Sequence, residues 1–431
     1  MRRWVIAVYR LGLAGCYNPS FEQNVPCSAA LTCPGDQVCD TTQSPPVCVG
    51  QLGSGSNEID SGIPDSANTA CGICPSDTPV CDSQSTTCRG CYSDSECGSH
   101  VCSESTGLCL TEAQTLYVKT TGDDANPCTH DLPCANVSRA VQLVDATHNV
   151  IRIYDGDYDD SFVTTGLTFL LSGEGNNNNN ATIHFHTTAA ATNHIMEVHG
   201  GNVAVEGVSF EGGVAESVRV QGGATLSMFS CEILNSPIGS IDVQSSTVNL
   251  YGVEIHDGQG TEAAINMNNG TLVMQRGLMY ALGGACIRAS GARYDIENSI
   301  LTGCAAEGFA QTGPVLSMAI FSFNTVVGNG TGVSCAGAIT VKNSIFAFSN
   351  NPPPQLEACA AASYSLFSDT AATGTGNIAG DPSFVANDDL HINFNSPGRD
   401  HAEPNATATF DFDGEPRPHG SGYDIGADEH Y

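Results

Sequence analysis

Cysteine thiols are the most concentrated reactive groups of this 431-residue chain. It has 20 cysteines, and thirteen of them lie between Cys16 and Cys109. Such a density is typical of a disulfide framework or of metal sites. Twelve of the thirteen fall into three modules of four: Cys27, Cys33, Cys39 and Cys48; Cys71, Cys74, Cys81 and Cys88; Cys91, Cys97, Cys102 and Cys109.

Few large apolar residues separate these cysteines, so the modules need covalent cross-links in place of a hydrophobic core. We therefore interpret all twelve as disulfide candidates, and the pairing within each module stays open among three possibilities. The alternative is a four-thiolate zinc site, since Cys71-x2-Cys74 and Cys88-x2-Cys91 have the spacing of zinc ligands. The disulfide interpretation is favoured because the first module lacks this motif and the N-terminus indicates export to an oxidising compartment.

Two further groups of side chains could bind a metal ion. A run of aspartates after a predicted strand is a Ca²⁺ candidate by its carboxylate density, against the alternative of a solvated acidic loop. A His-x-His pair would place two rings on one face of a strand, against the alternative of ordinary surface histidines. The aspartates are Asp155, Asp157, Asp159 and Asp160; the histidines are His184 and His186, joined by His194 or His199.

The N-terminus has the pattern of an export signal. Arg2 and Arg3 precede a short apolar stretch that ends in Leu13-Ala14-Gly15-Cys16. This tetrad resembles the lipobox of bacterial lipoproteins, which implies a signal peptide over residues 1–15 and lipidation of Cys16. Tyr17 stands where an aspartate would typically retain a lipoprotein at the inner membrane. The expected location is therefore the outer membrane, on its surface or periplasmic face, and otherwise outside the cell.

The elements that would position these groups begin at Leu116, where short β-branched runs alternate with Gly, Asn and Ser. An apolar alternation around one anchor residue recurs every 19–26 residues. Two to three short strands per period, with tight polar turns, predict a coil of parallel strands. A Gly, Ser or Asn anchor permits a left-handed bend between strands. The anchors are Gly207, Ser230, Gly252, Arg276, Asn298, Asn324 and Asn343.

The alternation also predicts which side chains face the core. Val205, Leu250, Ile296 and Val341 should point inward and stack in one hydrophobic column, and Glu254 should point outward.

Seven cysteines lie beyond the modules, and four of them frame loops. We predict disulfides between Cys128 and Cys134 and between Cys335 and Cys359. Cys231 and Cys286 are predicted to be buried, unbonded thiols within the rungs of the coil.

Both ends of the coil carry recognisable motifs. Residues 116–124 (Leu-Tyr-Val-Lys-Thr-Thr-Gly-Asp-Asp), Pro133-Cys134-Ala135-Asn136-Val137 and the strand with Gly-Asp-Tyr at 150–158 resemble the beginning of bacterial pectate-lyase-like β-helix proteins. Residues 381–385, 413–418 and 424–429 resemble the closing motif of the same group. The resemblance implies a right-handed parallel β-helix with a capping helix. The helical spacing of the cap residues agrees with this, and those residues are Val137, Ala140, Val141 and Val144.

The predicted chain is thus all-β. It comprises a signal peptide (1–15), a cysteine-rich module (16–49), a flexible linker (50–70), two further modules (71–110), the β-helix (115–400) and a closing segment (401–431). The modules resemble the cysteine-rich N-terminal stalks of myxobacterial lipoproteins.

Charge limits the function. Lys and Arg total 14 against 46 Asp and Glu, a net charge of −32, which opposes binding to nucleic acid and to acidic polymers. Many β-helices are polysaccharide lyases or hydrolases, but the sequence shows no dense carboxylate cluster beside the basic rung residues Arg219, Arg276, Arg288, Arg293 and Lys342, so no catalytic residue is assigned.

The leading hypothesis is a lipid-anchored surface protein that binds glycan, matrix or a surface protein without catalysis. The alternative is a polysaccharide lyase or glycoside hydrolase acting in a groove of the β-helix. No cofactor is required, and Ca²⁺ is the candidate ion.

Overall fold

A computed structural model describes residues 38–40, 47–49, 71, 74–82, 86–103, 105–173, 183–186, 194–314, 316, 319–349, 355–357, 360–369 and 373–431. The predicted signal peptide, Cys16, Cys27, Cys33, the linker at 50–70 and Cys359 lie outside these residues. The chain divides into a unit of residues 1–73 and a unit of residues 74–431. The described part of the first is the antiparallel pair β1 (Val38–Asp40) and β2 (Val47–Val49), in which Cys39 lies opposite Cys48.

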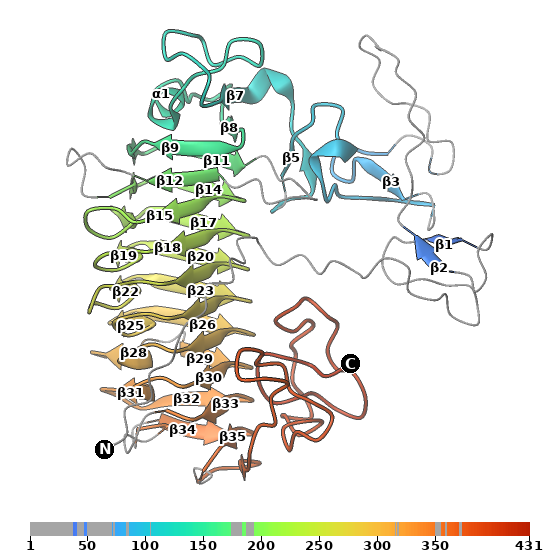
Figure 1. The fold of residues 1–431 in the computed structure, drawn as a ribbon, viewed down its shortest axis with the longest axis vertical. Coiled ribbons are helices and arrows are strands. Elements are labelled where there is room, and N and C mark those ends of the chain that lie inside the picture. The colour runs from blue at the N-terminus through green and yellow to red at the C-terminus, as the bar shows by residue number, and fades with distance from the viewer. Residues whose placement is uncertain are drawn as a thin grey trace. The chain divides into compact units, whose positions relative to one another are not determined.

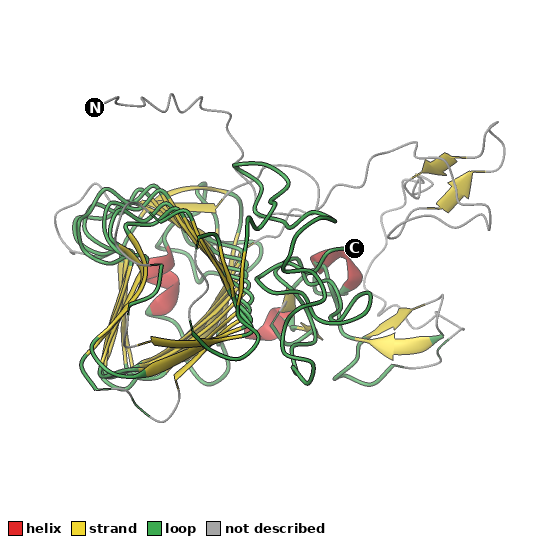
Figure 2. Ribbon diagram, turned by 90° about the horizontal axis from the view of Figure 1, so that it is seen from below, coloured by secondary structure: helices red, strands yellow, loops and turns green. Residues whose placement is uncertain are grey.

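Three parallel sheets run along the second unit (Figure 1), which confirms the predicted right-handed parallel β-helix. Among the described residues, sheet 1 has 11 strands, sheet 2 has 11 and sheet 3 has 8. Each strand pairs with the strand one turn later in the chain, and the described pairings within the three sheets are all parallel. Seen along its axis in Figure 2, the coil encloses a core between the three sheets.

Sheet 1 contains β7 (Thr115–Val118), β8 (Val150–Ile153), β11 (Thr168–Gly173), β14 (Asn202–Glu206), β17 (Thr225–Phe229), β20 (Thr247–Tyr251), β23 (Thr271–Gln275), β26 (Arg293–Glu297), β29 (Ala319–Ser322), β32 (Ile339–Lys342) and β34 (Ala360–Ser363). Sheet 2 contains β9 (Gly156–Asp159), β12 (Ile183–His186), β15 (Ser209–Glu211), β18 (Glu232–Leu234), β21 (Glu254–His256), β24 (Leu278–Tyr280), β27 (Ile300–Thr302), β30 (Thr325–Val327), β33 (Ile345–Ala347), β35 (Leu366–Phe367) and β36 (Ile378–Ala379). Sheet 3 contains β10 (Phe162–Thr165), β13 (Met196–His199), β16 (Val218–Gln221), β19 (Ile241–Gln244), β22 (Ile265–Asn268), β25 (Ile287–Ser290), β28 (Glu307–Thr312) and β31 (Thr331–Cys335).

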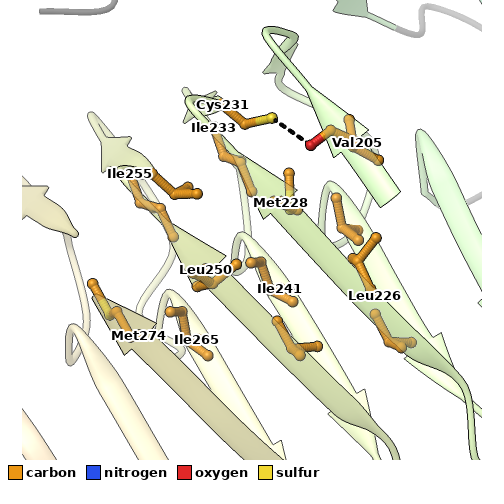
Figure 3. Close-up of a cluster of buried hydrophobic side chains, with 14 of the residues drawn as sticks. Val205, Leu226, Met228, Cys231, Ile233, Ile241, Leu250, Ile255, Ile265 and Met274 are labelled. Carbon is orange, nitrogen blue, oxygen red and sulfur yellow. Dashed lines mark hydrogen bonds between the residues drawn. The ribbon is translucent and has the colours of Figure 1, made fainter. Parts of the chain in front are cut away.

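The core is the hydrophobic column that the alternation predicts. Val205, Leu250, Ile296 and Val341 are fully buried. In register, Leu250 lies between Met228 of the previous turn and a methionine of the next (Figure 3). Side chains of successive turns therefore stack at the strand spacing of about 4.8 Å.

The left-handed bends lie where the anchors predict them, with one exception. Positive φ angles of 48–62° occur at Gly207, Ser230, Gly252, Arg276, Asn298 and Asn343. In the remaining turn the bend is at Phe323 (φ 54°), one residue before the predicted Asn324. The buried side chain of Asn324 instead forms hydrogen bonds to the previous turn, along the coil axis. Its Oδ1 accepts from the Ser299 amide at 3.0 Å, and its Nδ2 donates to the Ile296 carbonyl at 2.8 Å.

The N-terminal end is closed by α1 (Val137–Val141), whose Val137 and Ala140 are fully buried against the first turns. No helix of the described residues is long and apolar enough to cross a bilayer.

The second and third cysteine-rich modules, which precede the coil, are cross-linked by disulfides. The second contains β3 (Val80–Asp82) and β4 (Thr87–Arg89); the third contains η1 (Asp94–Glu96), β5 (Cys102–Ser103) and β6 (Leu108–Cys109), and η2 (Glu112–Gln114) leads into the coil. The bonds are Cys74–Cys88, Cys91–Cys102 and Cys97–Cys109, and Cys71 and Cys81 are also disulfide-bonded. The four cysteines of the zinc alternative are all consumed in this way, so they offer no thiolate.

The third module packs on the outer face of sheet 1. Asp94 forms an ion pair with the buried Arg152 of β8. Glu206 of β14 accepts from the Ser103 hydroxyl at 3.2 Å and from the Ser105 amide at 3.0 Å. This module is therefore part of the coil's surface.

Within the coil, Cys128 and Cys134 are joined, and Cys335 is disulfide-bonded. Cys231 has a buried, reduced thiol that donates to the Phe229 carbonyl at 3.2 Å. The prediction for Cys286 is wrong: it is buried but bonded to Cys304. The two cysteines lie in the same bend of adjacent turns, so they are neighbours although 18 residues separate them in sequence.

Residues 381–431 form the C-terminal lobe, which consists of irregular loops beside the coil (Figures 1 and 2). The last coil strand ends at Ala379, before the predicted boundary at 400. The lobe covers the outer face of sheet 2 at its late strands, where the Ala427 amide donates to Thr325 Oγ1 at 3.0 Å and Ile425 packs with Ile345.

Candidate functional site

The outer face of sheet 2 at its early strands β15, β18, β21 and β24 carries several titratable side chains. In each three-residue strand the middle side chain is buried and the two flanking side chains point outward. Parallel pairing therefore aligns two outward rows along the coil axis. One row is Ser209, Glu232, Glu254 and Leu278; the other is Glu211, Leu234, His256 and Tyr280.

Glu232 is held by hydrogen bonds from both neighbouring turns. Ser209 Oγ donates to its Oε2 at 2.7 Å, and His256 Nε2 lies 2.8 Å from its Oε1. The other ring nitrogen, Nδ1, lies 3.0 Å from Asp257 Oδ2. A ring that donates to carboxylates from both nitrogens is protonated, so His256 and Glu232 form an ion pair on the outer face.

Glu254 lies directly beside Glu232, because β18 and β21 pair in register at these two residues. Its side chain is half-buried and hydrogen-bonded to Tyr280. The Tyr280 ring stacks on the His256 ring with centroids 4.7 Å apart and planes 1° from parallel. This stack fixes both the phenol and the imidazole next to the two carboxyl groups.

The environments of the two glutamates push their pKa values apart. The hydrogen bond from His256 lowers the pKa of Glu232, against the opposing effect of burial. Burial raises the pKa of Glu254, and the Tyr280 hydrogen bond offsets only part of this. Burial also disfavours the charged ring of His256, but the hydrogen bonds to Glu232 and Asp257 outweigh it and raise the pKa of His256. Two neighbouring carboxyl groups thus have pKa values shifted in opposite directions, the pattern of an acid–base pair.

The sequence-predicted metal candidates lie on the same sheet but do not form a ligand sphere. Asp157 and Asp159 project outward from β9, and the Asp160 carboxylate accepts from the Ser138 amide at the start of α1 at 2.8 Å. Asp155 precedes the strand, and its buried Oδ1 has no hydrogen bond within the described part of the chain. The four are not among the groups of three ligand atoms within 4.8 Å found in the described part of the chain.

The histidines divide between two sheets. His184 and His186 point outward from β12, in register with Asp157 and Asp159 of β9. His194 is buried, with its Nδ1 2.8 Å from the Glu216 carbonyl, and His199 is on β13 of sheet 3. The structure therefore keeps the His-x-His pair on one face and separates His199 from it.

The basic rung residues are used elsewhere. Arg219 pairs with Asp242 at 3.1 Å and Arg288 with Glu262 at 3.5 Å; Lys342 pairs with Glu403 at 3.2 Å. Arg276 donates to backbone carbonyls of the C-terminal lobe, and Arg293 begins β26 of sheet 1. None of these five is on the sheet 2 strands that hold the glutamates.

Sequence reasoning missed Glu232, Glu254, His256 and Tyr280 as a group. The signal was present in the ladder, since both glutamates stand two residues after an anchor, Glu232 after Ser230 and Glu254 after Gly252. Equal offsets in consecutive turns place side chains next to each other in a parallel coil.

Comparisons with known proteins return β-helix enzymes at low similarity. The pectate lyase Pel9A covers 75% of this chain and 98% of its own, at 13% identity and a TM-score of 0.41. A rhamnogalacturonan lyase covers 59% of this chain and 72% of its own, at 14% identity and a TM-score of 0.41. A GH136 lacto-N-biosidase from Eubacterium ramulus covers 59% and 67%, at 8% identity and a TM-score of 0.24. No family model and no curated protein sequence matches the chain.

Proposed function

We propose that this protein is a glycoside hydrolase whose site is the outer face of sheet 2 at β18, β21 and β24. The observation that carries the proposal is the adjacent pair Glu232 and Glu254, one held ionised by His256 and the other favoured in its neutral form by burial. Two carboxyl groups with separated pKa values are the minimal machinery for cleaving a glycosidic bond.

The roles follow from the two environments. Glu254, whose pKa is raised by burial, protonates the leaving glycosidic oxygen while Glu232 attacks the anomeric carbon and forms a glycosyl ester. Glu254 then takes a proton from the water that hydrolyses this ester. Neighbouring strands are about 4.8 Å apart, which favours the short carboxyl separation of the retaining mechanism over the wider one of inverting enzymes. His256 keeps Glu232 ionised and fixes its orientation.

Charge selects the substrate class. The net charge of −32, with carboxylates at the site itself, opposes the approach of uronic-acid polymers. A neutral glycan meets no such barrier. The substrate class proposed is therefore a neutral polysaccharide or oligosaccharide, and hydrolysis is favoured over the β-elimination that lyases perform on acidic polymers.

The proposed location is the outer membrane, with Cys16 as the lipid anchor. The anchor rests on Leu13-Ala14-Gly15-Cys16, and the outer membrane on Tyr17 in place of a retaining aspartate. Replacing the thiol in Cys16→Ser should release the protein from the membrane fraction or leave its signal peptide uncleaved. If the variant fractionates with membranes to the same extent as the wild type, the anchor proposal fails.

A second candidate is non-catalytic glycan binding by the same face. It is favoured by one observation: both oxygens of Glu232 already accept hydrogen bonds from Ser209 and His256, so the network is complete without a substrate. A rigid polar ladder of this kind could contact a sugar chain without reacting with it.

One experiment separates the two candidates. The purified chain is screened for binding on a glycan array, and bound glycans are tested for release of reducing sugar. Hydrolysis predicts that Glu254→Gln and Glu232→Gln each lower release by about 10²-fold or more while binding persists. The matched control is Glu211→Gln on β15 of the same face, which should leave release unchanged. Binding with no release by the wild-type chain would support the second candidate and reject the first.

A further inference from the structure

A second cluster of titratable side chains lies in the C-terminal lobe and includes neither glutamate of the pair. His391, Asp413 and Asp428 each offer one atom, and these three atoms lie within 4.8 Å of one another. The His391 Nε2 atom is 2.8 Å from Asp413 Oδ2. The three residues come from separate loops, so the lobe must fold to bring them together.

The ring of His391 is oriented by a fourth residue. Its Nδ1 hydrogen-bonds to the Asp389 carboxylate on the side opposite Asp413. Metal-binding histidines typically donate their remaining ring N–H to a carboxylate, which fixes the tautomer and aims the other nitrogen at the ion. Asp389 therefore corresponds to the carboxylate that orients the ring, and Nε2 is the nitrogen available to bind a metal ion.

The two aspartates have carboxylate oxygens that the protein does not satisfy. Asp413 Oδ1 is buried and has no hydrogen-bond partner among the residues that the structure describes. Asp428 is 6% exposed; its Oδ2 accepts from the Ile392 amide at 2.7 Å, and its other oxygen receives no hydrogen bond from the described residues. Buried carboxylate oxygens normally have partners. Each aspartate thus keeps acceptor capacity for an ion, and one oxygen of each lies within 4.8 Å of the ligand atom of His391.

The nearby arginines do not neutralise these aspartates. Arg276 uses its guanidinium on the backbone carbonyls of Phe412 and Asp413, at 2.8 and 3.1 Å. Arg417 forms an ion pair with Glu429 at 3.1 Å, with both side chains fully buried. No arginine is therefore fixed on the two aspartates. In the metal-free chain the cation beside them is the His391 ring, which hydrogen-bonds to Asp389 and Asp413, and a metal ion would replace the proton on Nε2.

We propose that His391, Asp413 and Asp428 bind one divalent transition-metal ion, with Zn²⁺ as the ion of first choice. One imidazole and two carboxylates form a mixed nitrogen–oxygen set, which suits Zn²⁺ better than the all-oxygen sites of Ca²⁺ and Mg²⁺, and water would complete the tetrahedron. The ion would join the loops at 391, 413 and 428.

Such a cross-link has a clear structural purpose. The lobe contains no cysteine, and its described residues form only the isolated bridges Phe384–Ile392 and Phe410–Pro416 in place of sheets. A loop-rich segment without disulfides gains most from a metal, because binding energy then contributes directly to folding.

The test uses the full-length chain without a histidine tag. The protein is stripped with a chelator and dialysed, and Zn²⁺, Mn²⁺ and Ca²⁺ are titrated separately while bound metal and the thermal midpoint are measured. The proposal predicts one Zn²⁺ per chain, a rise in the midpoint, and weaker binding of Ca²⁺. Asp389→Asn should weaken Zn²⁺ binding about 10–100-fold through the ring orientation. Asp428→Asn, which keeps the side-chain shape, should abolish the one-to-one binding.

The matched control is His401→Ala, a histidine of the same lobe whose ring contacts the Arg399 carbonyl; its Zn²⁺ binding should equal that of the wild type. Circular dichroism on each variant shows whether the coil remains folded. The proposal is overturned if the folded wild-type chain binds no Zn²⁺ at one equivalent, or if Asp428→Asn binds as tightly as the control. Either result would mean that the cluster serves only as the ion pairs of a protonated His391 with Asp389 and Asp413.

Discussion

Arg417 and Glu429 form a fully buried ion pair, with Arg417 Nη1 3.1 Å from Glu429 Oε2. The same guanidinium donates to the carbonyls of Asp424 and Gly426 at 3.0 and 2.8 Å and lies over the Phe323 ring of the coil. The backbone of the closing motif thus surrounds the Arg417 guanidinium. The guanidinium hydrogen-bonds to backbone carbonyls that have no strand partner in these irregular loops.

Breaking this pair should be costly. Arg417→Met leaves the Glu429 carboxylate buried without its cation, so we expect the free energy of unfolding to fall by about 3–5 kcal/mol. The double variant Arg417→Met with Glu429→Leu removes both charges and should recover much of that loss. Urea unfolding monitored by near-ultraviolet circular dichroism measures both. Equal losses in the single and double variants would show that the charge pairing is not the cause.

The core column gives a second prediction. Leu250→Asp places a carboxylate between Met228 and Met274 without a partner and should destabilise the coil by several kcal/mol, about 3 or more. Thr340→Asp, on the exposed face of β32, is the matched control and should change the free energy of unfolding by less than about 0.5 kcal/mol. Similar losses in the two variants would contradict the assignment of Leu250 to the inside.

The pH dependence of hydrolysis follows from the glutamate pair. Glu232 must be ionised, and its pKa lies below the ordinary 4.5; Glu254 must be protonated, and its pKa lies above 4.5. Activity should therefore rise as the pH increases through the lowered pKa of Glu232 and fall as the pH passes the raised pKa of Glu254, giving an acidic optimum. The profile of kcat/KM against pH measures both limits.

Tyr280→Phe tests the assignment of the alkaline limit. The Tyr280 hydroxyl stabilises the ionised form of Glu254, so its removal should raise the pKa of Glu254 further and shift the alkaline limit of kcat/KM to higher pH. The acid limit, set by Glu232, should not move. A shift of the acid limit alone would mean that the roles of the two glutamates are exchanged.

The strand spacing also predicts the stereochemistry of the product. Carboxyl groups on neighbouring strands about 4.8 Å apart favour a covalent intermediate and net retention at the anomeric carbon. Proton NMR of the first product formed, before mutarotation, distinguishes the two anomers. An inverted first product would require a second carboxylate farther from Glu254 than Glu232 is.

The sequence by itself determined the coil. A repeat of short strands carries its period, its inward and outward faces and its bends in local patterns, so Leu250 could be assigned to the core and Gly252 to a left-handed bend without coordinates. The capping helix at Val137 was equally local. One bend was misplaced: it lies at Phe323 instead of Asn324, where the interval between anchors is longest, at 26 residues. There the Asn324 side chain hydrogen-bonds along the coil axis instead of forming the bend.

Only the tertiary structure decided which residues of those faces and of the loops contact one another. Glu232 and Glu254 are 22 residues apart in sequence, and Cys286 and Cys304 are 18 apart, yet each pair consists of neighbours because one turn of the coil returns the chain to the same face. His391 and Asp428 meet through irregular loops that have no period to read. A regular coil repeats its local geometry, so sequence patterns can fix it. Contacts between turns and within the lobe depend on where loops of unequal length end, and only the folded chain specifies that.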